Sequence, residues 1–153
     1  MQNNEALIAA LQDAVFRCSI PLRWGDMDAM RHVNNAVYFR FFEEARMRML
    51  DNAQAVDRTR RGFVLAHTSC DFLRPLVYPG SVVVVQIIRR VGRSSFALDA
   101  VIEREDEPGV AYAKGHYVVV GVDLATGRSM PWLEGELERL AKTVDPAEVS
   151  PAA

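Results

Sequence analysis

Residues 34–51, NNAVYFRFFEEARMRMLD, have the periodicity of one amphipathic helix. Val37, Phe41, Ala45 and Met49 recur every fourth residue, which places them on one face of a helix with about 3.6 residues per turn. A short amide side chain at the start of this stretch can accept a hydrogen bond from an otherwise unpaired backbone N–H. The pattern predicts one long helix with an apolar face buried against the rest of the molecule.

Strand patterns lie on both sides of this helix. One short strand is expected at residues 16–22, and longer ones at 63–73, 81–91, about 96–103 and 110–123. The run VVVVQII within residues 81–91 is β-branched and too apolar for a strand that faces water on both sides. Short amphipathic helices are expected at residues 5–15 and around 132–142, followed by a disordered tail from Thr143. This order predicts an α+β fold, with an antiparallel sheet that buries one face against one helix.

The composition is that of one ordinary globular domain. The chain has 153 residues, a formal net charge of −2 and an isoelectric point near 5.9, so it has no overall basic field for nucleic acid or an anionic membrane. Its first residues lack the basic start and long apolar run of a signal peptide, and no stretch is apolar enough to span a bilayer. We therefore expect a single cytoplasmic domain over residues 1–153, with reduced cysteines.

The stretch before the long helix carries the groups most suited to chemistry. Residues 23–38 read RWGDMDAMRHVNNAVY, with Asp26 and Asp28 just upstream of the helix start. A helix N-terminus has unpaired N–H groups and a partial positive charge, which can hold a carbonyl oxygen and the oxyanion formed from it. A carboxylate nearby can attack that carbonyl or take a proton from water. From spacing alone, turn and capping roles remain the commoner explanation of two such aspartates.

The same stretch resembles a known family signature. The Asp-Met-Asp, His-Val-Asn-Asn and Tyr of residues 26–38 are similar to the Asp-x-Asp-x-x-Gly-His-Val-Asn-Asn-x-x-Tyr signature of hotdog-fold thioesterases, and most closely to the 4-hydroxybenzoyl-CoA thioesterase and YbgC-like branch. The similarity continues in order through 71–75, 91–96 and 118–131, and covers about residues 16–140. It implies a hotdog fold, a five-stranded antiparallel sheet wrapped around one long central helix, and hydrolysis of an acyl-CoA to free acid and coenzyme A without a cofactor.

The resemblance also assigns roles to individual residues. It makes Asp28 the catalytic carboxylate, as nucleophile or general base, and it makes the backbone N–H of Asn35 the group that polarises the thioester carbonyl. Asp26 is expected to fix the loop by hydrogen bonding. The residues expected to contact the substrate are His32, Asn34, Tyr38, Arg93 and Ser95. One position departs from the family: Arg31 replaces a glycine. Either the loop takes another path, or the arginine accepts a positive φ at a cost of about 1 kcal/mol.

Other candidate groups have simpler explanations. Glu43 and Glu44 are expected to form surface ion pairs, Arg40 with Glu44 and Glu44 with Arg48. The histidines at 32, 67 and 116 are too dispersed in sequence for a metal site, so no metal is expected. The natural arginine cluster for the coenzyme A phosphates is Arg89, Arg90 and Arg93, although a solvated strand end is nearly as good an explanation.

Subunits of this family pair by joining sheets edge to edge, with active sites at the interface, so the resemblance implies a homo-oligomer, a dimer or a homotetramer. Residues 81–91 are expected to be the most apolar of the outer strands that need protection. Two other functions remain open. A hotdog dehydratase of 3-hydroxyacyl thioesters would need a histidine base with an acidic partner, and a non-catalytic acyl-thioester binding protein would not need Asp28. The sequence leaves the acyl group open.

Overall fold

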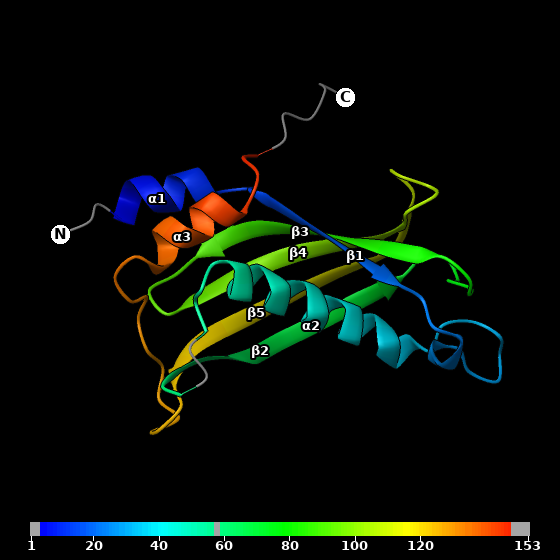
Figure 1. Cartoon of the computed structure of the whole chain (residues 1–153), viewed down its shortest axis with the longest axis horizontal. Helices are drawn as coiled ribbons and strands as arrows, with labels where there is room; N and C mark the ends of the chain where they lie inside the picture. Colours follow the sequence, from blue (N-terminus) through cyan, green and yellow to red (C-terminus); the bar gives the residue numbers. More distant parts are fainter. Residues whose placement is uncertain (1–3, 57–58, 148–153) are drawn as a thin grey trace.

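The computed structural model describes residues 4–56 and 59–147 as three helices and one five-stranded sheet. The elements follow in the order α1 (Asn4–Leu11), β1 (Val15–Pro21), a short 3-10 helix (Trp24–Asp26), α2 (Asn35–Asn52), β2 (Arg61–Phe72), β3 (Ser81–Val91), β4 (Ser95–Arg104), β5 (Ala111–Asp123) and α3 (Glu136–Thr143) (Figure 1). All strand pairs are antiparallel, in the order β1-β3-β4-β5-β2. The predicted α+β class and the five-stranded antiparallel sheet are confirmed.

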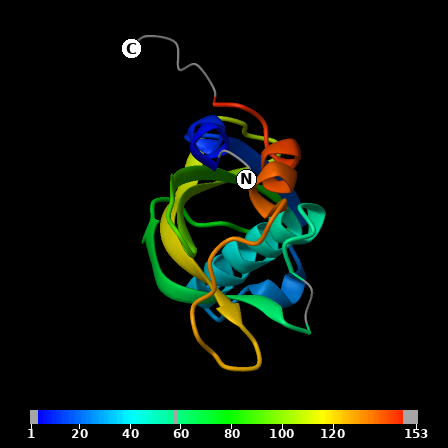
Figure 2. The ribbon, with the colours of Figure 1, turned by 90° about the vertical axis from the view of Figure 1, so that its left-hand side faces the viewer.

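Helix α2 lies across the concave face of the sheet, which curves around it (Figure 2). Phe42, Ala45 and Met49 on α2 are fully buried, as their spacing predicts. A Cβ atom at Gly115 would lie 2.6 Å from the Phe42 ring, so the glycine lets the helix approach the sheet closely. The short helices α1 and α3, expected near the two ends of the sequence, pack against each other at one end of the molecule (Figure 1).

The outer strands are β1 and β2, which corrects the sequence-based expectation for residues 81–91. Strand β3 lies between β1 and β4 and has no free edge. Its apolar run predicted a strand that does not face water on both sides, but a side-chain pattern does not show which strands pair with its backbone. Strand β2 has one open edge, and the exposed apolar side chains on it and just beyond it are Val64, Leu65, Phe72 and Leu73.

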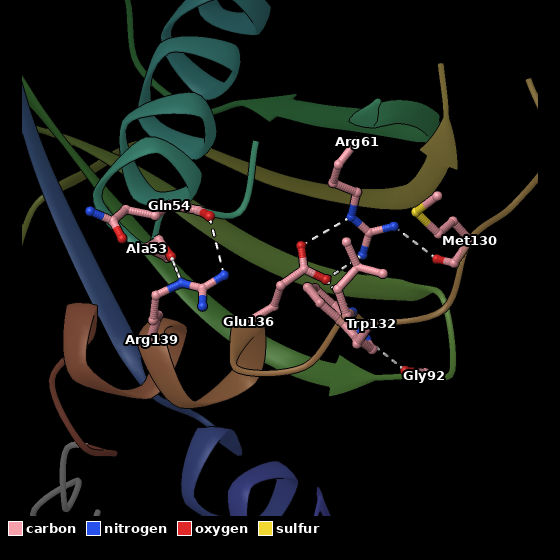
Figure 3. Close-up of polar contacts among 9 residues, drawn as sticks. Ala53, Gln54, Arg61, Gly92, Met130, Trp132, Glu136 and Arg139 are labelled. Atoms are coloured by element: carbon pink, nitrogen blue, oxygen red, sulfur yellow. Dashed lines mark hydrogen bonds and ion pairs between the residues drawn. The ribbon is translucent and has the colours of Figure 1, made fainter. Parts of the chain in front are cut away.

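The C-terminal segment is held by a buried ion pair (Figure 3). The Arg61 guanidinium at the start of β2 donates to both carboxylate oxygens of Glu136, at 2.9 and 3.1 Å, and to the Met130 carbonyl at 2.9 Å. Arg61 and Glu136 are 1% and 2% exposed. The Trp132 indole N–H donates to the Gly92 carbonyl at 2.9 Å. Together these bonds fix the segment before α3 onto the sheet.

The last described residues are better ordered than the sequence predicts. Thr143 ends α3, and Asp145 exchanges two backbone hydrogen bonds with Val15, at 2.8 and 2.9 Å. The rest of the tail predicted to be disordered, residues 148–153, lies outside the described residues. Within residues 4–56 and 59–147, no helix has the length and apolar character needed to cross a membrane.

Candidate active site

A small hairpin-like loop presents the Asp28 side chain just before α2. The Asp28 N–H donates to the His32 carbonyl at 3.0 Å, and the Arg31 N–H donates back to the Asp28 carbonyl at 3.0 Å. The Asp28 carboxylate accepts the Met30 N–H at 2.9 Å. The side chain is exposed, so its second oxygen is accessible to a substrate. The loop therefore holds one carboxylate in a defined position without burying it.

Arg31 has a backbone conformation that glycine adopts more easily than other residues. Its φ is 64°, in the left-handed region. Of the two possibilities that the sequence left open, the structure shows the second: the arginine accepts a positive φ. The presence of Arg31 in place of the signature's glycine therefore leaves the turn around Asp28 intact.

We expect Arg31→Gly to be more stable than Arg31→Ala by about 1 kcal/mol, because glycine has no Cβ to strain at positive φ. Both variants lose the same charged side chain, so the difference between them isolates the backbone cost. Urea unfolding measures it directly. Equal stabilities would mean that the turn relaxes around a side chain at no cost.

Asp26 has the structural role that the sequence suggested. Its side chain is buried, accepts the Arg23 N–H at 2.8 Å, and lies 3.8 Å from the Arg23 guanidinium. Its carbonyl accepts the Asn34 N–H at 2.9 Å, which joins the loop to the start of α2. The two aspartates thus differ in environment: Asp26 holds the loop from inside, while Asp28 faces solvent.

The start of α2 leaves the predicted polarising group available. Asn34 is the N-cap, and its side-chain oxygen accepts the Ala36 N–H at 2.9 Å. Asn34 was predicted to contact the substrate. In the structure its side-chain oxygen caps the helix. Among the described residues, no backbone or side-chain acceptor takes the N–H of Asn35, the first residue of α2. That N–H lies at the positive end of the helix dipole.

A pocket of about 220 Å³ lies at this helix start. Its lining residues are His32, Val33, Asn35, Tyr38, Phe72, Leu73, Arg74 and Pro75. The structure thus brings together three of the predicted site residues, and Asp28 lies beside the pocket through its bond to His32. Sequence reasoning did not assign residues 72–75 to the site, although their match to the family pattern was the signal that could have done so.

Tyr38 forms a wall of this pocket and belongs to the core. It is 2% exposed, its ring packs edge-on against Phe72 at 5.0 Å between centroids, and its hydroxyl accepts the Leu76 N–H at 3.4 Å. Burial raises the pKa of the Tyr38 hydroxyl above its ordinary value. The neutral side chain can shape the pocket, but it is not poised as a base at neutral pH.

Arg93 and Ser95 lie far from this pocket in the same chain. They belong to the turn between β3 and β4, at the opposite end of the sheet from the start of α2 (Figure 1). Helix α2 has 18 residues, which corresponds to a length of about 27 Å. The exposed Arg93 lines a separate hollow of about 310 Å³ beside Ile8 and Trp132. One protomer therefore does not place Arg93 and Asp28 in one site.

The expected arginine cluster at this turn is only partly present. The Arg89 guanidinium is bound to Asp13 at 2.7 Å and to Asp99 at 2.9 Å, on the side of the sheet away from α2. Its charge is therefore already balanced by two carboxylates. Arg90 and Arg93 are exposed, so they remain the candidates for binding phosphate.

The other acidic and histidine side chains considered from the sequence do not form a second active site. Glu44 pairs with Arg48 at 2.9 Å, while Glu43 lies 3.7 Å from Arg46. The expected pair between Arg40 and Glu44 does not form among the described residues. A hollow of about 600 Å³ between α2 and the end of β1 is lined by charges of both signs, among them Arg40, Glu43, Glu44 and Arg48. Within the described ranges, no group of histidine, cysteine and acidic side chains could hold a metal ion.

Comparisons with known proteins agree with this arrangement. The thioesterase-like superfamily matches residues 22–140. The long-chain acyl-CoA thioesterase FadM of Escherichia coli K12 is 33% identical over 129 residues, which is 82% of this chain and 96% of FadM. The structure of the Pseudomonas aeruginosa protein PA2801 superposes with a TM-score of 0.74 at 35% identity, over 77% of this chain and 92% of that one.

A more distant structure shares the fold. The 1,4-dihydroxy-2-naphthoyl-CoA thioesterase Slr0204 of Synechocystis has a TM-score of 0.73 at 18% identity, over 82% of this chain and 95% of that one. The family match spans the loop before α2 and the strands β2 to β5. The chain therefore belongs to the thioesterase-like superfamily, and the expected enzyme class, a thioester hydrolase, is confirmed.

Proposed function

We propose that this protein hydrolyses an acyl-CoA to a free acid and coenzyme A at the pocket where α2 begins. One observation carries the proposal: the exposed carboxylate of Asp28 is held in a fixed turn of the loop that leads into α2, and the N–H of Asn35 at the start of α2 is unpaired among the described residues. An acceptor-only carboxylate and a donor at a helix start are the two groups that acyl transfer from a thioester needs. The name of FadM supports the same reaction class.

The proposed chemistry follows from these two groups. The thioester carbonyl oxygen accepts the Asn35 N–H, and the helix dipole stabilises the negative charge that develops on that oxygen. Asp28 either attacks the carbonyl carbon directly, which breaks the carbon–sulfur bond and leaves a mixed anhydride that water then hydrolyses to the free acid, or it takes a proton from the water that attacks this carbon. In the second case the carbon–sulfur bond breaks, and the departing thiolate takes the proton back from Asp28. A thiolate leaves readily, so no strong acid is required beside the sulfur.

The sequence does not identify the acyl group of the substrate. Tyr38, Phe72 and Leu73 give the pocket apolar walls, which suit an apolar acyl chain or ring. The name of FadM favours a long chain, while the resemblance to the 4-hydroxybenzoyl-CoA thioesterase and YbgC-like branch favours an aromatic ring. Of these two we propose the long-chain acyl-CoA, since the FadM match spans most of both chains.

A thiol-release assay across short, long and aromatic acyl-CoAs tests the proposed function. We expect hydrolysis, with the highest kcat/KM for long-chain acyl-CoA. No release above background for any of these substrates would reject the proposal. Binding without release would favour the acyl-thioester binding protein, and water addition to an enoyl thioester would favour the dehydratase. The positions of His67 and His116 on the sheet face away from α2 argue against the dehydratase.

We further propose that the complete site needs two chains joined along β2. The free edge of β2 and its exposed apolar side chains can pair with the same edge of a second copy. Antiparallel pairing about a two-fold axis reverses the second sheet, so its β3–β4 turn lies at the end where the first chain's α2 begins. Arg93 of one chain would then bind the nucleotide of the substrate that Asp28 of the other chain attacks.

We expect Arg93→Ala to raise KM for acyl-CoA more than it lowers kcat, because a distant nucleotide contact is equally strong in the ground and transition states. The effect should shrink for a substrate truncated to its pantetheine arm, which lacks the phosphates near the nucleotide. Steady-state kinetics on both substrates measure the contrast. An equal loss on the two substrates would remove Arg93 from the nucleotide site.

Mixed dimers separate a contact across the interface from one within a chain. The Arg93→Ala and Asp28→Asn variants can be mixed, unfolded and refolded together to form mixed dimers. In a mixed dimer, the chain that retains Asp28 faces a partner that retains Arg93. A contact across the interface restores one site with wild-type KM in each such dimer. A contact within one chain restores none, because the chain with Asp28 then lacks its own arginine.

A further inference from the structure

We infer that the hollow between α2 and the end of β1, here called the β1 hollow, is a second ligand site that binds a long-chain fatty acid through its carboxylate. Its volume is about 600 Å³, within the range of about 300–1,000 Å³ that small-molecule sites occupy. None of its lining residues lines the pocket where α2 begins. The choice of a fatty acid rests on the proposed function, which releases one, whereas the geometry of the hollow does not depend on it.

The β1 hollow lies at the edge of the sheet away from β2. Strands β1 and β2 are the two outer strands, with β3, β4 and β5 between them. The proposed dimer joins two copies along β2, so it leaves this hollow open. Strand β1 and helix α2 meet at the loop of residues 22–34, and the hollow extends from that loop along α2 as far as Arg48 (Figure 1).

Part of the wall of this hollow is apolar. Val37 and Phe41 are four residues apart on α2, so they lie on the same side of the helix. Ile20 and Pro21 line the hollow from the end of β1. A hydrocarbon chain that lies between the two elements would cover these side chains and lose its own contact with water.

The charges that line the hollow leave one cation unbalanced. Each of the three acidic groups has a basic partner. The pairs are Asp26 with Arg23 at 3.8 Å, Glu43 with Arg46 at 3.7 Å and Glu44 with Arg48 at 2.9 Å. Arg40 is exposed and also lines the hollow, and among the described residues its guanidinium has no acidic partner. An anionic group is therefore the ligand that Arg40 lacks.

A carboxylate suits Arg40 better than a phosphate does. The planar guanidinium can donate two parallel hydrogen bonds to a carboxylate. Arg40 follows Val37 by one turn and adjoins Phe41, so a head group bound there has apolar walls beside it for its chain. The neighbouring carboxylates of Glu43 and Glu44 would repel a head group with several negative charges, such as the phosphates of an acyl-CoA. A fatty acid has one negative charge and a long apolar chain.

Titration with dodecanoate, labelled with ¹³C at its carboxyl carbon and followed by NMR, tests the site. We expect a bound carboxylate signal for the wild type. For Arg40→Gln we expect a Kd at least about tenfold higher, because the charge-assisted bond is lost. Val37→Asn should also weaken binding, since it places a polar amide against the chain. The matched control is Arg128→Gln, which removes an exposed arginine from the turn after β5 and should keep the wild-type Kd.

Three results would overturn the inference. The first is a wild-type protein with no bound signal at millimolar dodecanoate. The second is a folded Arg40→Gln protein with the Kd of the wild type, because the acid would then be bound elsewhere; if this variant does not fold, an unchanged Kd for Val37→Asn has the same meaning. The third is equal affinity for butyrate, which carries the same carboxylate on a short chain and should bind at least about tenfold more weakly.

Failure of the proposed reaction is a separate outcome. The acid is added directly, so its binding does not require hydrolysis. Arg40→Gln should hydrolyse acyl-CoA with the kcat and KM of the wild type, because Arg40 does not line the pocket where α2 begins. A protein that binds dodecanoate at Arg40 but releases no thiol from any acyl-CoA would reject the proposed function and leave this site in place.

Discussion

Replacing Asp28 with Asn is expected to lower kcat for acyl-CoA hydrolysis by about a thousandfold or more. An amide of the same shape can neither attack the carbonyl carbon nor accept a proton from water, so the chemistry is lost whichever role Asp28 has. The fold should survive, because the side chain is exposed and an amide oxygen can still accept the Met30 N–H. Steady-state rates together with circular dichroism of the purified variant measure both parts.

Asp26→Asn is the matched control for this variant. The Asp26 carboxylate is buried and accepts the Arg23 N–H, so the change should weaken the loop and lower stability. Its effect on kcat should be smaller than that of Asp28→Asn, because Asp26 reaches the substrate only through the loop that it holds. If Asp26→Asn proves inactive and Asp28→Asn stays active, the roles of the two aspartates are reversed.

The largest stability loss is expected for Arg61→Met, at about 3–5 kcal/mol in the free energy of unfolding. The variant leaves the Glu136 carboxylate buried without its counter-ion, and it also removes the donor to the Met130 carbonyl. Urea unfolding followed by circular dichroism measures the loss. The double variant Arg61→Met with Glu136→Leu should recover most of it, because two apolar side chains of similar size leave no buried charge.

Lys142→Met provides the comparison at the surface. Lys142 pairs with Glu138 on the same helix, α3, at 3.5 Å, and its side chain is 75% exposed. Breaking this pair should change stability by less than about 1 kcal/mol. If Arg61→Met cost no more than Lys142→Met, the buried pair would contribute no more than an exposed one, and the C-terminal segment would be held by its apolar contacts instead.

The local pattern of the sequence predicted most elements of the fold. Residues 34–51 were expected to be helical, and α2 runs from Asn35 to Asn52. The expected strand at 81–91 coincides with β3. These predictions succeed because periodicity directly reflects which side of a helix or strand is buried. The cap expected from a short amide side chain at the start of this helix is provided by Asn34.

Features that depend on distant parts of the chain could not be predicted in this way. Residues 81–91 were expected at an edge of the sheet, but β3 lies inside it. Strand order depends on which backbones pair, and the alternation of apolar and polar side chains does not reveal it. Arg61 lies just before the strand expected at residues 63–73, and its partner Glu136 is 75 residues away. The pocket beside α2 takes Phe72 and Leu73 from a different element, so no local motif marks them as neighbours of Tyr38.

The buried bond between Arg61 and Glu136 also has a consequence for synthesis on the ribosome. The two residues are 75 positions apart, and Glu136 belongs to the last helix that the structure describes. A nascent chain therefore exposes the guanidinium long before its counter-ion has been translated. Since chains emerge N-terminus first at about 5–20 residues per second, roughly 4–15 s pass between the synthesis of Arg61 and that of Glu136, and this part of the core cannot close before then. The final packing of the domain must then wait until translation of the C-terminal helix is complete.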